Sequence, residues 1–244
     1  MTESPRSVEA FRDQAERYDR DAELLMGNRA WHRQYLADLL RCFDEAPRSF
    51  VDLACGTGFF TEVFFEVFPG IRGLGVDGSE AMLERARSRF DARGVQLELR
   101  RGLLQSVDWA TIDDGSTPLV FSAFAIHHLS DDEKRVLIGE IFEHLGGGGH
   151  FVLFDSFRPD ERAADDIVER LTALDIQRRV RDARGTEPQL DRIIARDREV
   201  KAAEGDQEAP FEAHLRWLRE IGFVAVTPVF LDARMGGIIA TKPA

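Results

Sequence analysis

Two glycines and a distant aspartate are the residues whose spacing could bind a ligand in this chain. The mainly apolar residues 50–55 run into Gly56 and Gly58, and residues 59–68 then have a helical pattern. A glycine turn lets bare backbone approach a ligand, and the helix points its N-terminal N–H groups at the same place. Asp77 ends a second apolar run, residues 71–76. An acid at the tip of the next parallel strand accepts hydrogen bonds from a ribose diol, so these residues predict a site for a ribose-bearing ligand.

The residue that follows the glycine pair indicates which kind of nucleotide is bound. A dinucleotide site carries a third small residue three positions after the second glycine, where helix and strand pack around a pyrophosphate. That position is Thr61 here, preceded by Phe59 and Phe60. The pattern therefore favours a ribose-bearing ligand without a pyrophosphate and disfavours a nicotinamide enzyme.

Composition limits the partners and the compartment. The 244 residues include 32 basic and 44 acidic side chains, for a formal charge of −12, which disfavours nucleic acid and anionic membranes as partners. Cys42 and Cys55 do not form a disulfide framework, so we expect a reducing, cytoplasmic location. Neither a secretory signal nor an apolar run of about 20 residues, as needed to span a bilayer, is recognised.

The elements that must position the glycine turn are predicted from hydrophobic periodicity. Two helices are expected between residues 8 and 43, with a break at 27–28, and a long helical insertion is expected over 159–220, with breaks at Gly185 and at 205–210. Its apolar stripes predict a lid over an acceptor or a dimer surface. The expected strands are 50–54, 71–76, 95–99, 118–124, 150–155, 223–231 and 235–242.

Several motifs together resemble one family. Asp52-x-x-x-Gly56-x-Gly58 is followed by Gly75-Val-Asp77-x-Ser79-x-x-Met82-Leu83-x-x-Ala86, and residues 121–130 and 145–155 continue the pattern. These segments are similar to the motifs of class I S-adenosylmethionine (SAM)-dependent methyltransferases, over about residues 46–157. The resemblance implies SAM as cofactor and is nearly silent on the acceptor.

The resemblance also implies the architecture. We expect an α/β fold with a doubly wound, seven-stranded, mostly parallel sheet of order 3-2-1-4-5-7-6, the last strand being antiparallel. Residues 1–45 would form an N-terminal helical cover, 46–157 the SAM-binding Rossmann-like core, 158–221 the helical insertion and 222–244 the C-terminal β-hairpin of the same sheet.

Site residues are carried over from the family position by position. Among the aromatic candidates of the leading helices, Phe11, Tyr18, Trp31 and Tyr35, we favour Tyr18. At the position after Gly102 the family usually carries an acidic residue, which accepts a hydrogen bond from the adenine amino group. Leu103 stands there instead, so this group must find a backbone carbonyl, Gln105 or Asp108. The cofactor-binding residues expected are Tyr18, Asp52, Ala54, Gly56, Thr57, Gly58, Asp77, Gly78, Met82, Gly102, Leu103 and Ala123.

His127 and His128 follow the expected fourth strand, at the edge of the sheet where α/β proteins bind ligands. A histidine there would serve as base or orienting group for a hydroxyl acceptor. Two adjacent histidines are not expected to face one way, so we expect at most one to line the pocket. Asp155, at the end of the fifth strand, is the second candidate for contact with the acceptor. The sequence predicts no metal site.

These observations predict a methyltransferase that acts on an oxygen or nitrogen, and less readily a carbon, of a small-molecule acceptor by in-line displacement. One alternative is an enzyme that modifies SAM itself, of the carboxy-SAM synthase type, because the layout of the insertion is similar. Another is a non-catalytic SAM-binding partner subunit, favoured by the missing acid at Leu103. A homodimer is the expected assembly if the insertion forms a dimer surface.

Overall fold

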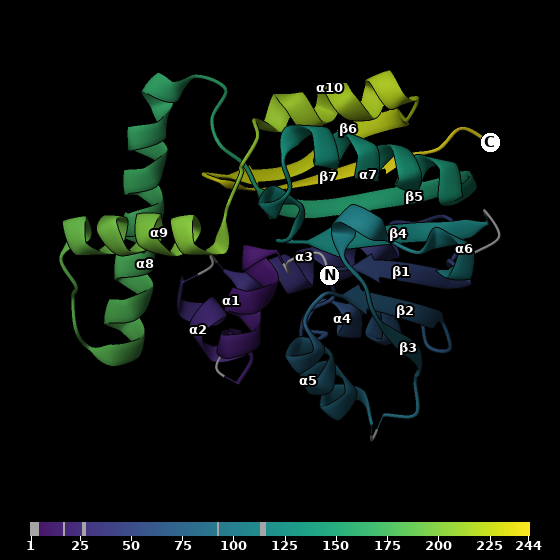
Figure 1. Cartoon of the computed structure of the whole chain (residues 1–244), viewed down its shortest axis with the longest axis horizontal. Coiled ribbons are helices and arrows are strands. Elements are labelled where there is room, and N and C mark those ends of the chain that lie inside the picture. The colour runs from purple at the N-terminus through teal and green to yellow at the C-terminus, as the bar shows by residue number, and fades with distance from the viewer. Residues whose placement is uncertain (1–4, 17, 26–27, 92, 113–115) are drawn as a thin grey trace.

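A seven-stranded sheet of order β3-β2-β1-β4-β5-β7-β6 forms the centre of the protein, as predicted (Figure 1). The computed structural model describes residues 5–16, 18–25, 28–91, 93–112 and 116–244. The strands are β1 (Ser49–Leu53), β2 (Arg72–Asp77), β3 (Gln96–Arg101), β4 (Thr117–Ala123), β5 (Leu145–Ser156), β6 (Val224–Asp232) and β7 (Met235–Thr241).

Strands β1 to β5 are parallel, and β7 inserts antiparallel between β5 and β6. β1 and β4 pair directly, with Val51 opposite Val120 and Leu53 opposite Ser122. Both strands are buried along most of their length, which explains why they appear in the sequence as continuous apolar runs. Their carboxyl ends therefore lie side by side, and the segments that follow them meet at one edge of the sheet.

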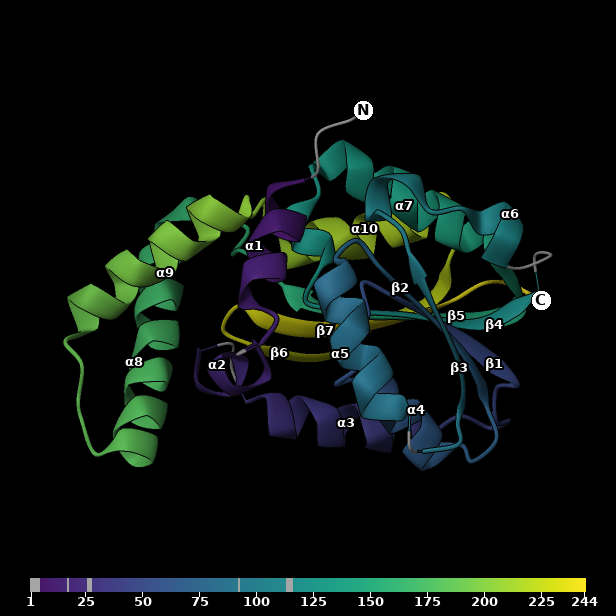
Figure 2. The ribbon, with the colours of Figure 1, turned by 60° about the horizontal axis from the view of Figure 1, so that its bottom comes forward.

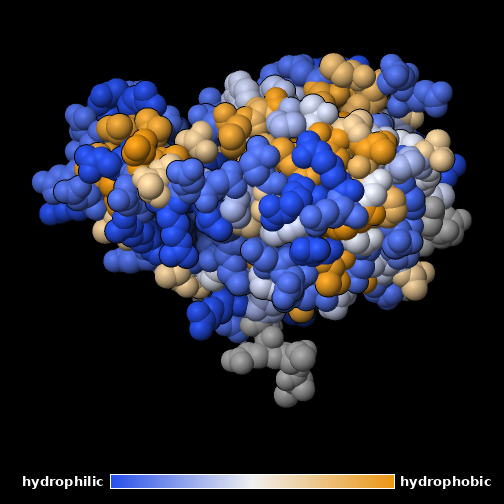
Figure 3. Space-filling model, turned by 90° about the horizontal axis from the view of Figure 1, so that it is seen from above, coloured by the Kyte–Doolittle hydropathy of each residue, from blue (hydrophilic) through white to orange (hydrophobic). Residues whose placement is uncertain are grey.

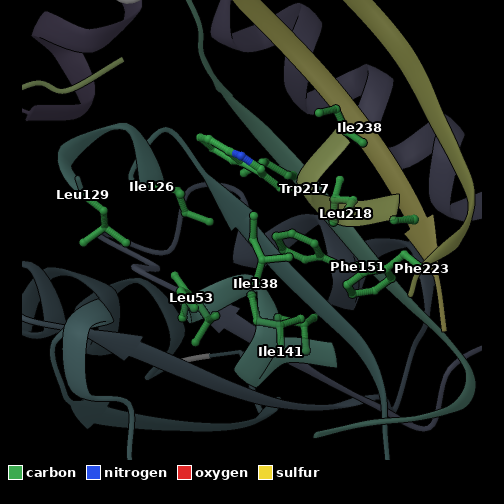
Figure 4. Close-up of a cluster of buried hydrophobic side chains, with 14 of the residues drawn as sticks. Leu53, Ile126, Leu129, Ile138, Ile141, Phe151, Trp217, Leu218, Phe223 and Ile238 are labelled. Atoms are coloured by element: carbon green, nitrogen blue, oxygen red, sulfur yellow. The ribbon is translucent and has the colours of Figure 1, made fainter. Parts of the chain in front are cut away.

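Helices cover both faces of this sheet (Figures 1 and 2). One face carries α3 (Arg29–Arg41), α4 (Thr61–Val67) and α5 (Glu80–Phe90), and the other carries α6 (Trp109–Ile112), α7 (Asp131–His144) and α10 (Phe211–Ile221). Figure 4 shows part of the core under α7 and α10, where Ile138 and Ile141 of α7 and Leu218 of α10 meet Phe151 of β5. Within the described ranges, no helix is long and apolar enough to cross a membrane.

Side-chain caps fix where two helices begin after the strand ends. Ser79 accepts a hydrogen bond from the Met82 amide at the start of α5. Ser130 and Glu133 form a reciprocal capping box at the start of α7. Such caps satisfy amide groups that have no partner within the helix. The loops 77–79 and 124–130 are thereby held in place at the edge of the sheet.

The N-terminal segment forms three helices where two were predicted: α1 (Arg6–Gln14), α2 (Tyr18–Leu25) and α3. The additional break comes between α1 and α2, where the sequence shows no glycine or proline. The predicted break at 27–28 falls partly outside the described residues. On its described side, Asn28 caps α3 by accepting a hydrogen bond from the Trp31 amide.

The insertion forms a helical hairpin, α8 (Asp165–Arg184) and α9 (Leu190–Glu204), which stands beside α1 and α2 and away from the sheet (Figures 1 and 2). Gly185 and Gly205 end these helices in the left-handed conformation, as their positions predicted. Apolar side chains lie on the surface of this hairpin (Figure 3), and Ile167 and Leu171 of α8 are more than half exposed. α10 belongs to the sheet, since it packs on α7, β6 and β7.

Candidate functional site

The two glycines of the turn have different physical roles. Both have a positive φ, +55° at Gly56 and +77° at Gly58. A Cβ at Gly58 would stand 2.5 Å from Cε2 of Phe90, whereas a Cβ at Gly56 would meet none of the described atoms within 4 Å. Gly58 is therefore required by the packing of the turn against α5. Gly56 faces open space and is the glycine that leaves room for a ligand.

Asp77 stands at the end of β2, opposite the turn. Its two carboxylate oxygens each accept an amide hydrogen, from Gly56 and from Ser79, both at 2.8 Å. Burial raises the pKa of Asp77, although these two bonds act in the opposite direction. Each oxygen keeps a further lone pair, and the carboxylate lines a cavity, so it can accept hydrogen bonds from the hydroxyls of a bound ribose.

This cavity has an empty volume of about 700 Å³ and lies beyond the carboxyl ends of β1, β2 and β4. Helix α1 covers it, with Val8 and Phe11 in its lining, and apolar groups of Met82, Leu103 and Leu104 form much of its wall. We call it the main cavity. Nine of the predicted cofactor residues line it: Tyr18, Ala54, Gly56, Asp77, Gly78, Met82, Gly102, Leu103 and Ala123.

A smaller cavity adjoins the main one, and both are lined by Tyr18, Ala54 and Gly56. Asp52 and Arg29, both buried, lie in the wall of this smaller cavity. Burial raises the pKa of Asp52 to about 7, against the hydrogen bond at 2.6 Å from the Thr61 hydroxyl. A buried guanidinium and a buried carboxyl in one small cavity suit the carboxylate and the ammonium of an amino acid.

Arg29 and Asp19 are site residues that the sequence did not single out. The Arg29 guanidinium lies 4.1 Å from the centre of the Phe59 ring. Asp19 accepts a hydrogen bond at 2.7 Å from the Thr57 hydroxyl and one from Arg89. The Thr57 hydroxyl therefore links α2 to the glycine turn. This link holds Tyr18 of α2 in the lining of both cavities. Charged residues in an amphipathic helix carry no sequence signal for such a role.

Two residues beside the cavities are held in an uncommon backbone conformation. Ala54 follows β1 with φ +59° and Phe124 follows β4 with φ +53°. Such angles are costly for residues with a Cβ and are found preferentially at functional sites. Both residues line the main and the smaller cavity. The strain therefore lies where the two cavities meet.

His127 and Asp155 form a buried pair at the ends of β4 and β5. Nδ1 of His127 lies 2.5 Å from Oδ1 of Asp155, which also accepts a hydrogen bond from the Ser156 amide. Burial by itself lowers the pKa of His127, but Asp155 and the nearby Asp206 outweigh it and raise the pKa to about 9. Asp155 is fully buried and does not line either cavity. It lies behind His127, as a group that orients the imidazole.

The neighbouring His128 lines the main cavity, and His127 does not. The expectation that the two rings face different ways is nevertheless wrong. His127 Nε2 lies 3.9 Å and His128 Nδ1 3.0 Å from Oδ1 of Asp206, and the ring centres are 4.1 Å apart. The reason is that residues 126–128 form a 3₁₀ turn, in which side chains do not alternate as they do along a strand.

The remaining sequence candidates divide between the cavity and the core. Phe11 lines the main cavity together with Tyr18, whereas Trp31 and Tyr35 pack on Phe230 of β6. Gln105 lines the cavity beside Leu103, and Asp108 does not. Gln105 is thus the side chain that can replace the missing acid.

The two cavities together fit a nucleoside that carries an amino-acid chain. Asp77 and the apolar wall of Met82 and Leu103 suit the ribose and the base, and Arg29 and Asp52 suit the zwitterion. The open space at Gly56 leaves a path between the two parts. SAM has this composition, so the residues present fit it.

Known sequences give the same assignment. A family described as "Methyltransferase domain" matches residues 50–149. Demethylmenaquinone methyltransferase of Thermus thermophilus is 31% identical over 163 residues, which cover 66% of this chain and 70% of that protein. Malonyl-[acyl-carrier protein] O-methyltransferase of Legionella pneumophila is 33% identical over 59% of this chain, which spans less than half, 46%, of that relative. A trans-aconitate 2-methyltransferase of Acidovorax is 41% identical over 30% of this chain and 29% of its own length.

Solved structures share the fold over nearly the whole chain. A methyltransferase of Haloferax volcanii, solved with the Trm112 methyltransferase activator, superposes with a TM-score of 0.66 at 16% identity, over 96% of this chain and 98% of that one. The pyocyanin biosynthetic protein PhzM gives 0.63 at 19% identity, over 96% of this chain and 61% of that one. The motifs, the sheet order and the Thermus relative together show that this chain belongs to the class I SAM-dependent methyltransferases, with SAM as its cofactor.

Proposed function

We propose that the protein transfers the methyl group of SAM to an oxygen or nitrogen of a small-molecule acceptor that binds beside His128. The observation that carries this proposal is the position of His128, which lines the main cavity at the end of β4 and is backed by the buried His127–Asp155 pair. Ligands of open α/β sheets bind at this edge. The reacting group of an acceptor would therefore lie close to the imidazole.

The cofactor roles proposed for the lining residues follow from their chemistry. Asp77 accepts hydrogen bonds from the ribose hydroxyls, and Gly56 lets the backbone approach the ligand. Gly78 and Gly102 also line the cavity, but packing requires them too, because a Cβ there would meet Val8 and Leu103 or Val76. Met82 and Leu103 flank the adenine, and the amide oxygen of Gln105 accepts a hydrogen bond from the adenine amino group. At the other end, Arg29 binds the carboxylate and Asp52 the ammonium of the methionine part.

SAM supplies a methyl group on a positively charged sulfur, which needs little covalent help from the protein. The protein must bring the acceptor atom in line with this methyl group and keep water out. Helix α1 and Tyr18 of α2 cover the cavity and exclude water. His128 orients the acceptor, and Asp155 keeps the neighbouring His127 in one orientation.

The acceptor is proposed only as a class. The relatives' names specify demethylmenaquinone, a malonyl carrier protein and trans-aconitate, which differ widely in chemistry. The net charge of −12 favours a small molecule over nucleic acid. The α8–α9 hairpin is proposed to close over the acceptor, because it stands beside α1 and α2, whose residues line the cavities. The exposed stripe of α8 leaves a homodimer as the other role for this hairpin.

The test measures S-adenosylhomocysteine formed from SAM with a panel of small hydroxyl, carboxyl and amine acceptors. His128→Gln is expected to lower kcat at least about tenfold and to leave the affinity for S-adenosylhomocysteine unchanged, since general-base or orienting groups contribute about 10²-fold or more. His150→Gln is the matched control, because His150 lies on β5 and bonds only to Thr241 in the described structure. Equal kcat for His128→Gln and wild type on an accepted substrate would contradict the proposed role.

Mass spectrometry of the cofactor that copurifies with the protein addresses the SAM-modifying alternative. Unmodified SAM or S-adenosylhomocysteine is expected. A carboxylated SAM derivative would instead identify a carboxy-SAM synthase. Turnover by the purified chain alone would exclude a purely non-catalytic partner subunit.

A further inference from the structure

Two histidines and one aspartate converge beside the main cavity. Among the described residues, His127, His128 and Asp206 form a group whose ligand atoms all lie within 4.8 Å of one another. The Asp206 Oδ1 atom is 3.0 Å from His128 Nδ1 and 3.9 Å from His127 Nε2. An ion with tetrahedral bonds of about 2.1 Å holds its ligand atoms about 3.4 Å apart. The two distances from Asp206 are thus within about 0.5 Å of the spacing that one metal ion needs.

Three polar atoms of this group are buried and lack hydrogen bonds within the described residues. The side chains of His128 and Asp206 are exposed by only 8% and 9%. Within the described part of the chain, both ring nitrogens of His128 and Oδ1 of Asp206 have no hydrogen-bond partner, because the close approach of Nδ1 and Oδ1 is not aligned as one. Unsatisfied polar groups are costly to bury. A cation between Asp206 Oδ1 and one ring nitrogen of His128 would satisfy two of these atoms together.

His127 has the carboxylate contact that is typical of a metal-binding histidine. Its Nδ1 is engaged by Asp155, which leaves Nε2 facing Asp206. Metal-binding histidines commonly donate their other ring N–H to a carboxylate, which fixes the ring and raises its basicity. The same contact that orients His127 therefore prepares it as a ligand.

Tertiary hydrogen bonds hold the loop of Asp206 against the histidine turn. The Gln207 amide donates to the His127 carbonyl at 2.7 Å, and the Gln207 side chain donates to the His128 carbonyl at 3.1 Å. The ammonium of Lys134, fully buried, donates to the carbonyls of Leu129 and Gln207. The group is thus fixed before any ion binds, which lowers the entropic cost of binding.

We propose that His127 Nε2, His128 and Asp206 bind one divalent transition-metal ion of the Zn²⁺ type. A set of two imidazoles and one carboxylate binds such ions more readily than it binds Mg²⁺ or Ca²⁺, which prefer oxygen ligands. Three protein ligands leave a coordination position open. His128 and Asp206 line a surface cavity through which an ion can enter, and His128 also lines the main cavity. His128 therefore connects the proposed ion site with the place where the acceptor is proposed to bind. Binding of the ion does not depend on the identity of that acceptor.

The proposal is tested by metal binding to the tag-free, full-length protein. After treatment with a chelator and dialysis, the protein is titrated with Co²⁺ by visible absorption and with Zn²⁺ by calorimetry. We expect saturation at one ion per chain, intense visible bands of four- or five-coordinate Co²⁺, and displacement of Co²⁺ by Zn²⁺. Lack of saturable binding by the wild type would overturn the proposal.

Variants separate the site from adventitious binding. Asp206→Asn should weaken Co²⁺ affinity at least about 100-fold. Asp155→Asn, which removes the carboxylate that holds His127, should weaken it about 10- to 100-fold. His150→Gln should bind like the wild type. Each variant is compared with the wild type by circular dichroism and S-adenosylhomocysteine binding, which report a folded cofactor site. If folded Asp206→Asn retains wild-type affinity, His127, His128 and Asp206 do not form the site.

Discussion

The cofactor half and the acceptor half of the site are built in opposite ways. The cofactor half uses the ends of β1 and β2 with the turns that follow them, and Asp77 meets Gly56 across neighbouring strands. The proposed acceptor half combines His128 and the His127–Asp155 pair with Asp206, which comes from the loop after α9. Only the first half is a local consequence of the parallel sheet. The second depends on where a long insertion packs.

The names of the relatives specify different acceptors, which agrees with this difference. A strand, a glycine turn and an acid at the next strand end make one constellation wherever the sheet forms. A loop carried by an inserted hairpin is free to change without disturbing the core. The halves should therefore respond separately to substitution, and the following predictions, from the largest expected effect to the smallest, test that separation.

Asp77→Ala removes the carboxylate that holds the turn and is proposed to accept the ribose hydroxyls. Each hydrogen bond to a charged group contributes about 1.5–3 kcal/mol, so the loss of two such bonds should lower the affinity for S-adenosylhomocysteine at least about 100-fold. Calorimetric titration measures this loss, and Glu98→Gln on exposed β3 is the control. An unchanged affinity in Asp77→Ala would mean that the ligand does not contact this carboxylate.

Gly58→Ala tests the packing role of the second glycine. The added methyl group meets the Phe90 ring and the backbone stays at φ +77°, so we expect the free energy of unfolding to fall by about 2–4 kcal/mol. Gly185→Ala shares the positive φ but has open space around it, and should cost about 1 kcal/mol. Urea denaturation of both variants gives the difference. Equal losses would show that Phe90 moves aside.

Lys134→Met should disturb the acceptor half alone. It removes the donor that joins Leu129 to Gln207, and leaving buried carbonyls unsatisfied should cost about 2 kcal/mol in unfolding free energy. We expect a lower kcat with unchanged affinity for S-adenosylhomocysteine, whereas Arg135→Met, an exposed neighbour on α7, should change neither. A matching loss of cofactor affinity in Lys134→Met would show that the two halves are coupled.

Asp52 gives the cofactor half a pH dependence. Its pKa of about 7 in the free protein means that the carboxyl is largely protonated below pH 7. A bound ammonium favours the ionised form, so SAM binding should release a proton and strengthen as pH rises from 6 to 7, by at most about tenfold per pH unit, then level off. Calorimetry in buffers of different ionisation enthalpy measures the proton released. Asp52→Asn should remove the dependence of SAM affinity on pH. If the dependence persists in this variant, it belongs to another group.

Much of the fold was predictable from sequence because it rests on local patterns. The apolar runs that became β1, β2 and β4 are continuous since both of their faces are covered, and Ser79 marks the start of α5. The break between α1 and α2 escaped prediction because it lacks a glycine or proline. Asp19 escaped as well, because its partners, Thr57 and Arg89, are distant in the sequence.

The sequence by itself determined the sheet, the glycine turn and the acid opposite it. These features depend on residues whose spacing matches the repeat of strand, turn and helix, so the chain order carries the geometry. Only the tertiary structure decided that His127 and His128 both approach Asp206 and that Asp155 lies behind them. That arrangement depends on a 3₁₀ turn and on the packing of an insertion, and no local pattern encodes which distant carboxylate such packing brings to an imidazole.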